Sequence, residues 1–372
     1  MLAAAIAAPL RAAQPVMPFN VDQLAQFLAR ARGQKDAKVA KELSTVEPTQ
    51  RISVARLAQW EDEFRGRRTR QALTELADAS SFLNLPPSDI PDQAPPDLAS
   101  MRAILVRSIA YVKQTLHKLP DFYALRTTTN YKDPLALLQD QRSLCNSPGL
   151  RSICMADAGE AASAGAVNST PHLVAGRSHA IVTYVDGEEI DNGHRGAASS
   201  TSHPLSGLVT TGEFGPILDV VLGDALNGNV FWSHWEHGPD GLLAVFRYAV
   251  PAAKSHYKVT LPTGTGLQSF EPAYHGEIAI DPASGAIYRI TVIADPAPPY
   301  ELIEVSMMVQ YGSVIIGGKS YICPLKGVAI SRLPTILRLP GWRSPEEVPL
   351  TWLNDITFTR YHLFRAQVKI LR

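Results

Sequence analysis

Three titratable side chains lie close together in one segment of the chain, His234, Glu236 and His237. Histidine and glutamate are common ligands of zinc and related metals. The segment is predicted to be a β-strand, in which successive side chains point to opposite faces, so His234 and His237 would point away from each other. Only His234 and Glu236 share a face, and two ligands do not make a metal site. We therefore expect surface or hairpin-end polar residues here, and neither a bound metal nor a cofactor.

Two further motifs resemble catalytic or phosphate-binding patterns. Gly176–Ala180, GRSHA, has the Gly-x-Ser-x-small spacing of a nucleophile elbow, which places serine between a strand and a helix. The residues that follow, IVTYV, are typical of a strand, so Ser178 lacks the helix that an elbow requires. Pro262–Gly266, PTGTG, is a Gly-rich turn without the lysine and helix that phosphate binding requires. Because the spacing supports no nucleophile–base pair, we expect no catalytic residue and no enzymatic activity.

Aromatic side chains are concentrated in one predicted hairpin, and methionines follow on a nearby strand. They form either an ordinary core or the wall of a cavity for acyl chains or another apolar ligand, to which flexible methionine adapts well. The two interpretations differ in whether the protein's own helices fill the inner face of the sheet. The candidate ligand-binding residues are Phe231, Trp232, Trp235, Phe246, Tyr248, Val305, Met307 and Val309.

The chain has three cysteines. Cys145 and Cys154 bracket a short, turn-rich loop, NSPGLRSI, that a disulfide could close in an oxidising compartment. Cys323 would then remain as a buried thiol on a strand. In a cytosol all three thiols would be free.

Charge and hydropathy exclude two classes of protein and favour export. Lys+Arg and Asp+Glu both number 35, so the basic excess expected of a nucleic-acid-binding protein is missing. No apolar run reaches the roughly 18–20 residues of a transmembrane helix. Leu2–Leu10 is an Ala-rich apolar stretch followed by small residues, as in the hydrophobic region of a signal peptide. We expect residues 1–19 to be a signal-peptide remnant and the protein to be periplasmic or otherwise exported.

The first part of the chain has the pattern of short amphipathic helices. Apolar residues recur at three-and-four spacing over residues 20–83, which predicts a small helical bundle. Residues 84–97 are proline-rich and predict an extended linker. A further helix is expected from Leu98 to about His117. Another is expected within Thr211–Leu226, with Pro216 favouring a later start because proline is best tolerated in the first turn.

From about Phe122 the pattern changes to β-hairpins. In Gly276–Asp295, two alternating apolar strands flank an Asp-Pro-Ala-Ser-Gly turn. Asp186-Gly187 and Gly317-Gly318 indicate two further turns. We therefore expect an α+β fold in which a small α-helical domain precedes a curved antiparallel sheet, a half-barrel over residues 98–372, with helices on its concave face.

The order of these elements resembles the periplasmic lipoprotein-carrier fold, the class of the lipoprotein localisation factors. The resemblance rests on a leading amphipathic helix, an inserted helix, and the hairpins IAIDPASGAIYRI and MMVQYGSVIIGGKSYICPLKGVAI. The segments LPDFYALRTTTNY, TTGEFGPIL and LNDITFTRYHLF also resemble uncharacterised bacterial envelope proteins of this kind. The resemblance implies a half-barrel in which helices form a lid over an apolar cavity. The extra helices at 20–83 depart from a dedicated lipoprotein carrier.

Two functions follow as expectations. The first is an exported envelope protein that binds an apolar or lipid-like ligand, such as lipoprotein acyl chains, in the half-barrel cavity without catalysis. The alternative is a protein–protein interaction or envelope-sensing scaffold with a filled sheet core, in which residues 20–83 bind an envelope protein. Neither function involves nucleic acid or a transmembrane span.

Overall fold

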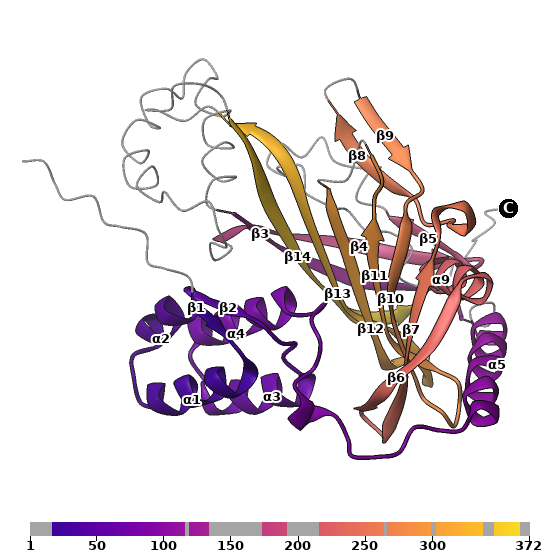
Figure 1. Cartoon of the computed structure of the whole chain (residues 1–372), viewed down its shortest axis with the longest axis horizontal. Helices are drawn as coiled ribbons and strands as arrows, with labels where there is room; N and C mark the ends of the chain where they lie inside the picture. Colours follow the sequence, from indigo (N-terminus) through magenta and orange to yellow (C-terminus); the bar gives the residue numbers. More distant parts are fainter. Residues whose placement is uncertain are drawn as a thin grey trace, which may run out of the picture.

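A computed structural model describes residues 17–115, 119–133, 173–191, 216–263, 266–298, 303–337 and 346–364. These residues form a helical bundle near the N-terminus and a large antiparallel sheet with two helices of its own (Figure 1). The prediction of an α+β chain built on a large antiparallel sheet is confirmed. Within the described ranges, no helix combines the length and apolar character needed to cross a membrane.

Residues 17–83 form the helical bundle. Its first helix begins with a capping box, because the Asn20 side chain accepts from the Gln23 backbone N–H and the Gln23 side chain accepts from that of Asn20. Val21, Leu24 and Leu28 are buried on one face of this helix, as their spacing predicts. The elements are β1 (Met17–Phe19), α1 (Val21–Ala31), α2 (Asp36–Leu43), β2 (Val46–Pro48), α3 (Val54–Glu63) and α4 (Arg67–Ala79), followed by the 3-10 helix η1 (Pro87–Asp89).

The main sheet has ten strands in the order β5-β4-β3-β14-β13-β12-β11-β10-β7-β6, all paired antiparallel. It is open, with β5 and β6 at its two edges. Its strands are β3 (Phe122–Lys132), β4 (Leu173–Val185), β5 (Glu188–Asp191), β6 (Asn229–His237), β7 (Leu242–Val250), β10 (Ala273–Ile280), β11 (Ile287–Asp295), β12 (Glu304–Ile316), β13 (Lys319–Leu337) and β14 (Glu346–Leu363). A 3-10 helix η4 (Ala252–Lys254) and a separate hairpin of β8 (Val259–Thr263) and β9 (Gly266–Phe270) follow β7.

Two hairpin turns confirm the sequence prediction. Asp186 and Gly187 join β4 to β5 with φ of 52° and 85°, and Gly317 and Gly318 join β12 to β13 with φ of 57° and 85°. Two consecutive residues with positive φ form the type I′ turn, whose twist matches that of antiparallel strands.

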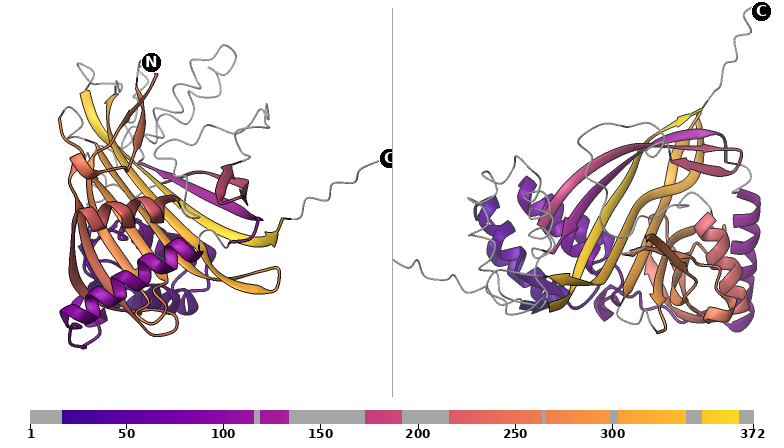
Figure 2. Two further views of the ribbon diagram at one scale, coloured as in Figure 1. Left: turned by 90° about the vertical axis from the view of Figure 1, so that its right-hand side faces the viewer. Right: turned by 90° about the horizontal axis from the view of Figure 1, so that it is seen from above.

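Two helices pack on one face of the sheet, α5 (Leu98–Thr115) and α9 (Pro216–Asn227). Figure 2 shows both helices lying across the strands, with the bundle behind them on the far side of the sheet. The described part of α9 starts at Pro216, and residues 211–215, over which its start was expected, lie outside the described residues. Apolar side chains of both helices, among them Ile104, Val112 and Val221, join those of the strands in the largest core cluster of the described residues.

The helical bundle contacts the opposite face of the sheet. Ala79 and Phe82, at the end of α4, pack against the side chains of Tyr131, Val328 and Leu353 on the central strands. This arrangement follows from strand alternation, because side chains that point away from α5 and α9 point toward the bundle. On β12 the two rows are divided in this way, with Met307 in the core beneath the helices and Met308 in the cluster that the bundle contacts.

The proline-rich linker is held at both ends. Its 3-10 turn is bound to the bundle through Arg56, whose Nη2 lies 2.6 Å from Asp89 Oδ1. Closer to α5, the Ala94 carbonyl accepts a hydrogen bond of 2.9 Å from the indole N–H of Trp235 on β6. In Figure 1 the linker runs along the lower end of the sheet from the bundle to α5. Residues 84–97 thus connect elements on opposite faces.

The β10–β11 turn supports α5. Gly285 has φ of +80°, and a Cβ atom at this position would lie 2.6 Å from the backbone C and O of Arg107 on α5. Arg107 also donates a hydrogen bond to the Pro282 carbonyl in the same turn. Glycine is therefore required here both for its backbone conformation and for the close approach of the helix.

We expect Gly285→Ala to destabilise the protein more than Gly318→Ala does. Both glycines have a similar positive φ, 80° and 85°, and each alanine costs about 1–2 kcal/mol for this conformation alone. Gly318 has open space around the position of a Cβ atom, whereas at Gly285 the Cβ overlaps α5, which adds about 1–3 kcal/mol. Urea unfolding of the two variants measures the difference. Equal losses would show that α5 does not depend on this turn.

Candidate functional site between the bundle and the sheet

The structure brings seven of the eight candidate ligand-binding residues together on the face covered by α5 and α9. A β-bulge between Trp232 and His234 places Trp232 opposite Phe246 and Trp235 opposite Ala244, so both indole rings point to this face. Their side chains contact one another and the helices in a packed core, of which Trp232 is a half-buried member. The eighth residue, Phe231, is paired with Arg247 and is 60 % exposed, so it lies apart from the others.

His234 and Glu236 share the opposite face of the sheet, as strand alternation predicts. His234 Nε2 lies 3.6 Å from Glu236 Oε2, but the carboxylate of Glu236 is bound by two arginines. Among the described residues, no group of three or more His, Cys, Asp or Glu side chains could hold a metal ion.

These two arginines join the bundle to the sheet through a buried ion-pair network. Arg51 follows β2 of the bundle, Arg289 lies on β11, and each places Nη2 2.7 Å from Glu236 Oε2. Arg289 Nη2 also lies 3.2 Å from Glu277 Oε2. Burial by itself raises the pKa of Glu236, but the charges of Arg289 and Arg51 outweigh it and hold this pKa well below its usual range. The carboxylate therefore remains ionised in the interface.

A second network lies under the end of α4. Lys326 Nζ on β13 lies 2.5 Å from Asp78 Oδ1 and 3.4 Å from Asp355 Oδ1 on β14. Burial raises the pKa of Asp78 to about 7. Burial opposes the charge of Lys326, but the two neighbouring carboxylates outweigh it and raise the pKa of the lysine. This network holds α4 over the central strands.

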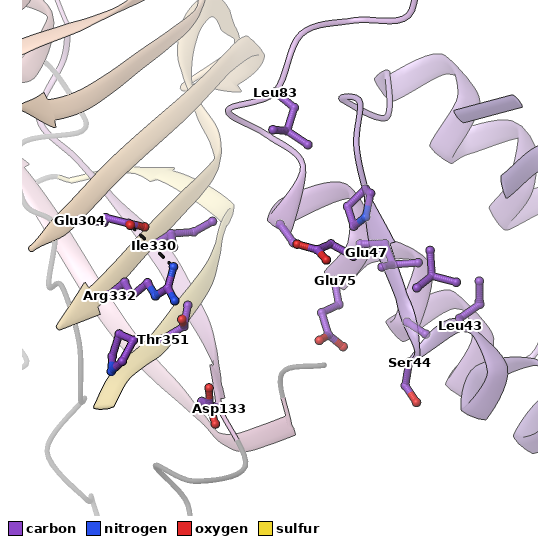
Figure 3. A pocket seen from close by; sticks show the side chains of 16 residues that line it. Leu43, Ser44, Glu47, Glu75, Leu83, Asp133, Glu304, Ile330, Arg332 and Thr351 are labelled. Carbon is purple, nitrogen blue, oxygen red and sulfur yellow. Dashed lines mark ion pairs between the residues drawn. The ribbon is translucent and has the colours of Figure 1, made fainter. Parts of the chain in front are cut away.

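A cleft of about 330 Å³ remains between the bundle and the sheet (Figure 3). One wall consists of residues of α2, β2 and α4 with Leu83, and the other of residues from β12, β13 and β14 with Asp133. Aliphatic side chains and prolines make up much of the lining, and charged groups are interspersed among them. The lining residues are Leu43, Ser44, Val46, Glu47, Pro48, Ala72, Glu75, Leu76, Ala79, Leu83, Asp133, Glu304, Ile330, Arg332, Pro349 and Thr351.

A buried aspartate on α9 also holds a histidine. Asp224 Oδ1 lies 2.6 Å from His256 Nδ1, while Asp224 Oδ2 accepts hydrogen bonds from the His256 backbone N–H and the Tyr274 hydroxyl. The ring of His256 is 76 % exposed, and the hydrogen bond and charge of Asp224 raise its pKa. The pair joins α9 to the chain after η4. An aspartate on the buried face of an apolar helix is the sequence signal that could have found it.

The other sequence motifs fall into ordinary strands or outside the described residues. Ser178 lies within β4, paired with Thr128, so the strand expected at IVTYV also includes GRSHA. Cys323 is a free, buried thiol on β13, as expected, and burial raises its pKa to about 12. Cys145 and Cys154 lie outside the described residues, so their disulfide stays a prediction.

We expect Glu236→Gln to destabilise the protein by about 3–5 kcal/mol, because it removes the carboxylate that neutralises two buried guanidinium groups. Glu63→Gln is the matched control. It breaks a solvent-exposed ion pair with Arg32 and should cost less than about 1 kcal/mol. Urea unfolding followed by tryptophan fluorescence measures both. Similar decreases in the free energy of unfolding of the two variants would contradict the conclusion that Glu236 neutralises buried charges in the interface.

We expect the pKa of His256, followed by NMR of the imidazole ring, to lie above the ordinary value near 6.5. Asp224→Asn should lower it, because the neutral amide cannot stabilise the imidazolium. Since the folded-state pKa is raised, the stabilisation is fully present below the pKa of the unfolded chain and is lost as the pH rises through the folded-state pKa. An unchanged pKa in Asp224→Asn would contradict the assigned contact.

The chain matches no family model, and comparisons with curated proteins and with solved structures likewise found no match. Any function must therefore be argued from the geometry of the chain itself.

Proposed function

We propose that the protein is a non-catalytic binding protein and that an apolar or lipid-like ligand occupies the cleft between the helical bundle and the sheet. The observation that carries the proposal is the cleft itself. Its volume, about 330 Å³, falls within the range of small-molecule sites, roughly 300–1,000 Å³. Leu83 and Ala79 on the bundle wall, and Ile330 and Pro349 on the sheet wall, give it accessible apolar surface on both sides. A ligand there would remove this surface from water, which is the main favourable contribution to binding.

The cleft is a better site than the face beneath α5 and α9. There the apolar candidates already contact helical side chains such as Val221 and Leu222, so a ligand would have to displace a helix from a packed core. The cleft requires no such displacement. Binding beneath the helices would require α5 to move away from the turn at Gly285.

We also propose that the sheet with α5 and α9 is a curved half-barrel of the lipoprotein-carrier kind, with the helices on its concave face, and that the protein is exported to the bacterial envelope. The support is the order of elements: α5, strands, the inserted helix α9, and then long consecutive hairpins. In this setting lipoprotein acyl chains are a ligand of the proposed class. The bundle at residues 20–83 would be the part that contacts an envelope protein.

The alternative function is an interaction or envelope-sensing scaffold with a filled sheet core. The specific observation in its favour is that α5 and α9 occupy the apolar face, with Phe246, Met307 and Val309 buried beneath them. A scaffold uses such a core only for stability, whereas a ligand-binding protein also needs an accessible cavity. The two functions therefore differ in whether the cleft takes up a small apolar molecule.

We expect the protein to bind Nile red, a neutral apolar fluorophore, saturably in the cleft, and Thr351→Trp to weaken this binding at least about tenfold by filling the site. Thr359→Trp is the matched control, because Thr359 is an exposed residue on the same strand outside the cleft. Fluorescence titration measures affinity, and circular dichroism checks the fold.

Each other outcome of this titration has a defined meaning. Unchanged binding in Thr351→Trp would exclude the cleft as the site. If Gly285→Ala alone altered the binding, the ligand would lie beneath α5. Failure of the wild-type protein to bind the dye, together with no co-purifying lipid by mass spectrometry, would favour the scaffold.

A further inference from the structure

The buried network under the end of α4 has two carboxylates and one ammonium group. Lys326 Nζ lies 2.5 Å from Asp78 Oδ1 and 3.4 Å from Asp355 Oδ1, so the same lysine serves both acids. The Asp78 side chain is 2 % exposed, and among the described residues no hydrogen-bond donor contacts its Oδ2 atom. A carboxylate removed from water is costly unless it is fully compensated. A proton on one of the two acids would remove the excess negative charge.

The network at Glu236 is balanced instead. Arg51 and Arg289 both bind Glu236, and Arg289 also binds Glu277, so two guanidinium groups serve two carboxylates. The charges of the two arginines hold the pKa of Glu236 well below its usual range, against the effect of burial. Of the two ion-pair networks that join the bundle to the sheet, the one at Asp78 therefore has a carboxylate that can take up a proton near neutral pH.

The other titratable groups around Asp78 come from four elements. Glu61 on α3 and Asp355 on β14 add negative charge, and both raise the pKa of Asp78. Tyr131 on β3 faces the same carboxylates, and burial raises the pKa of its hydroxyl, so it stays neutral. Glu75 on α4 and Arg177 on β4 carry opposite charges near Tyr131. Lys326 remains the cation that contacts Asp78 directly.

We propose that Asp78, Asp355 and Lys326 form a proton-dependent latch between the bundle and the sheet. One proton on the carboxylate pair holds α4 on the sheet more firmly than the deprotonated pair does. The inference concerns the docking of the two parts and is independent of any ligand in the cleft. Because α4 supplies Leu76 and Ala79 to the bundle wall of the cleft, the latch also holds this wall in place.

The direction of the pH effect follows from linkage. Burial raises the pKa of Asp78 to about 7, with the charge of Lys326 opposing the increase and that of Asp355 adding to it. The docked state therefore binds the proton more tightly than the unfolded chain, in which the pKa is ordinary. The resulting stabilisation is fully present below the ordinary pKa and is lost as the pH rises through about 7. Between pH 6 and pH 8 it changes the equilibrium constant about tenfold.

The test is urea unfolding of the full chain at pH 6 and at pH 8, for the wild-type protein and for Asp78→Asn. Asparagine has nearly the shape of aspartic acid but does not titrate. The unfolding equilibrium constant of the wild-type protein should increase from pH 6 to pH 8 about tenfold more than that of the variant. The comparison removes the contributions of groups that both proteins share, including His234 beside Glu236.

Two adjacent methionines locate the effect in the interface. Met308 belongs to the cluster that Ala79 and Phe82 cover, whereas Met307 lies in the core beneath α5 and α9. Hydrogen peroxide converts accessible methionine to its sulfoxide, and mass spectrometry measures the rate at each residue. In the wild-type protein the rate at Met308 relative to Met307 should be higher at pH 8 than at pH 6. In Asp78→Asn this ratio should be the same at both pH values.

Two further variants separate titration from a merely structural role. Asp355→Asn leaves Lys326 to Asp78 alone, so it should lower the pKa of Asp78 and move the pH-dependent step in stability to lower pH. Asp62→Asn is the matched control, because Asp62 is an exposed residue of α3. Its pH dependence should equal that of the wild-type protein.

The remaining outcomes decide against the latch. Equal pH dependence of unfolding in the wild-type protein and in Asp78→Asn would overturn it. A pH effect on the oxidation of Met307 without one on Met308 would place the titrating contact beneath α5 and α9 instead. If circular dichroism shows that Asp78→Asn does not fold, Asp355→Asn decides, and an unshifted pH profile in that variant would contradict the inference.

Discussion

The alternation of side chains along the β-strands is the constraint on which the rest of this structure depends. Strands β10, β11 and β12 each present an apolar row to the core beneath α5 and α9, and their other row, which includes Glu277, Arg289 and Met308, points to the side of the sheet where the bundle lies. On β11, Ile290 and Val292 belong to the core beneath the helices. Their neighbour Arg289 points to the other face, where it binds Glu236 and Glu277. One set of strands therefore supports two different interfaces.

The two interfaces differ in how specifically they position their partners. Apolar contacts beneath α5 and α9 are non-directional and stabilise in proportion to buried area. The bundle is placed by buried ion pairs, which contribute little net stability but strongly disfavour any position that separates the charges. Because the networks at Glu236 and at Lys326 lie under different parts of the bundle, they define its position at two points. The cleft is bounded by walls held in this way.

Local patterns in the sequence predicted the helices, strands and turns. Contacts between residues far apart in the chain could not be predicted from such patterns. The turns at Asp186-Gly187 and Gly317-Gly318 depend on a few neighbouring residues, and both are confirmed. Arg51 and Glu236 are 185 residues apart, and nothing in either segment indicates the other. The bulge after Trp232 likewise depends on the pairing with β7, yet it decides which aromatic side chains of β6 reach the core.

Because the cleft lies between the bundle and the sheet, which pack separately, a ligand in it would contact both parts. A ligand that touches Leu76 on the bundle and Ile330 on the sheet contributes its contacts only while the two parts are docked. Binding and docking are therefore linked, and each must strengthen the other by the same free energy. The ion-pair networks would then set affinity without touching the ligand, since they hold the two walls together. A binding function for this chain thus depends on the whole interface between bundle and sheet, including charged residues far from the cleft.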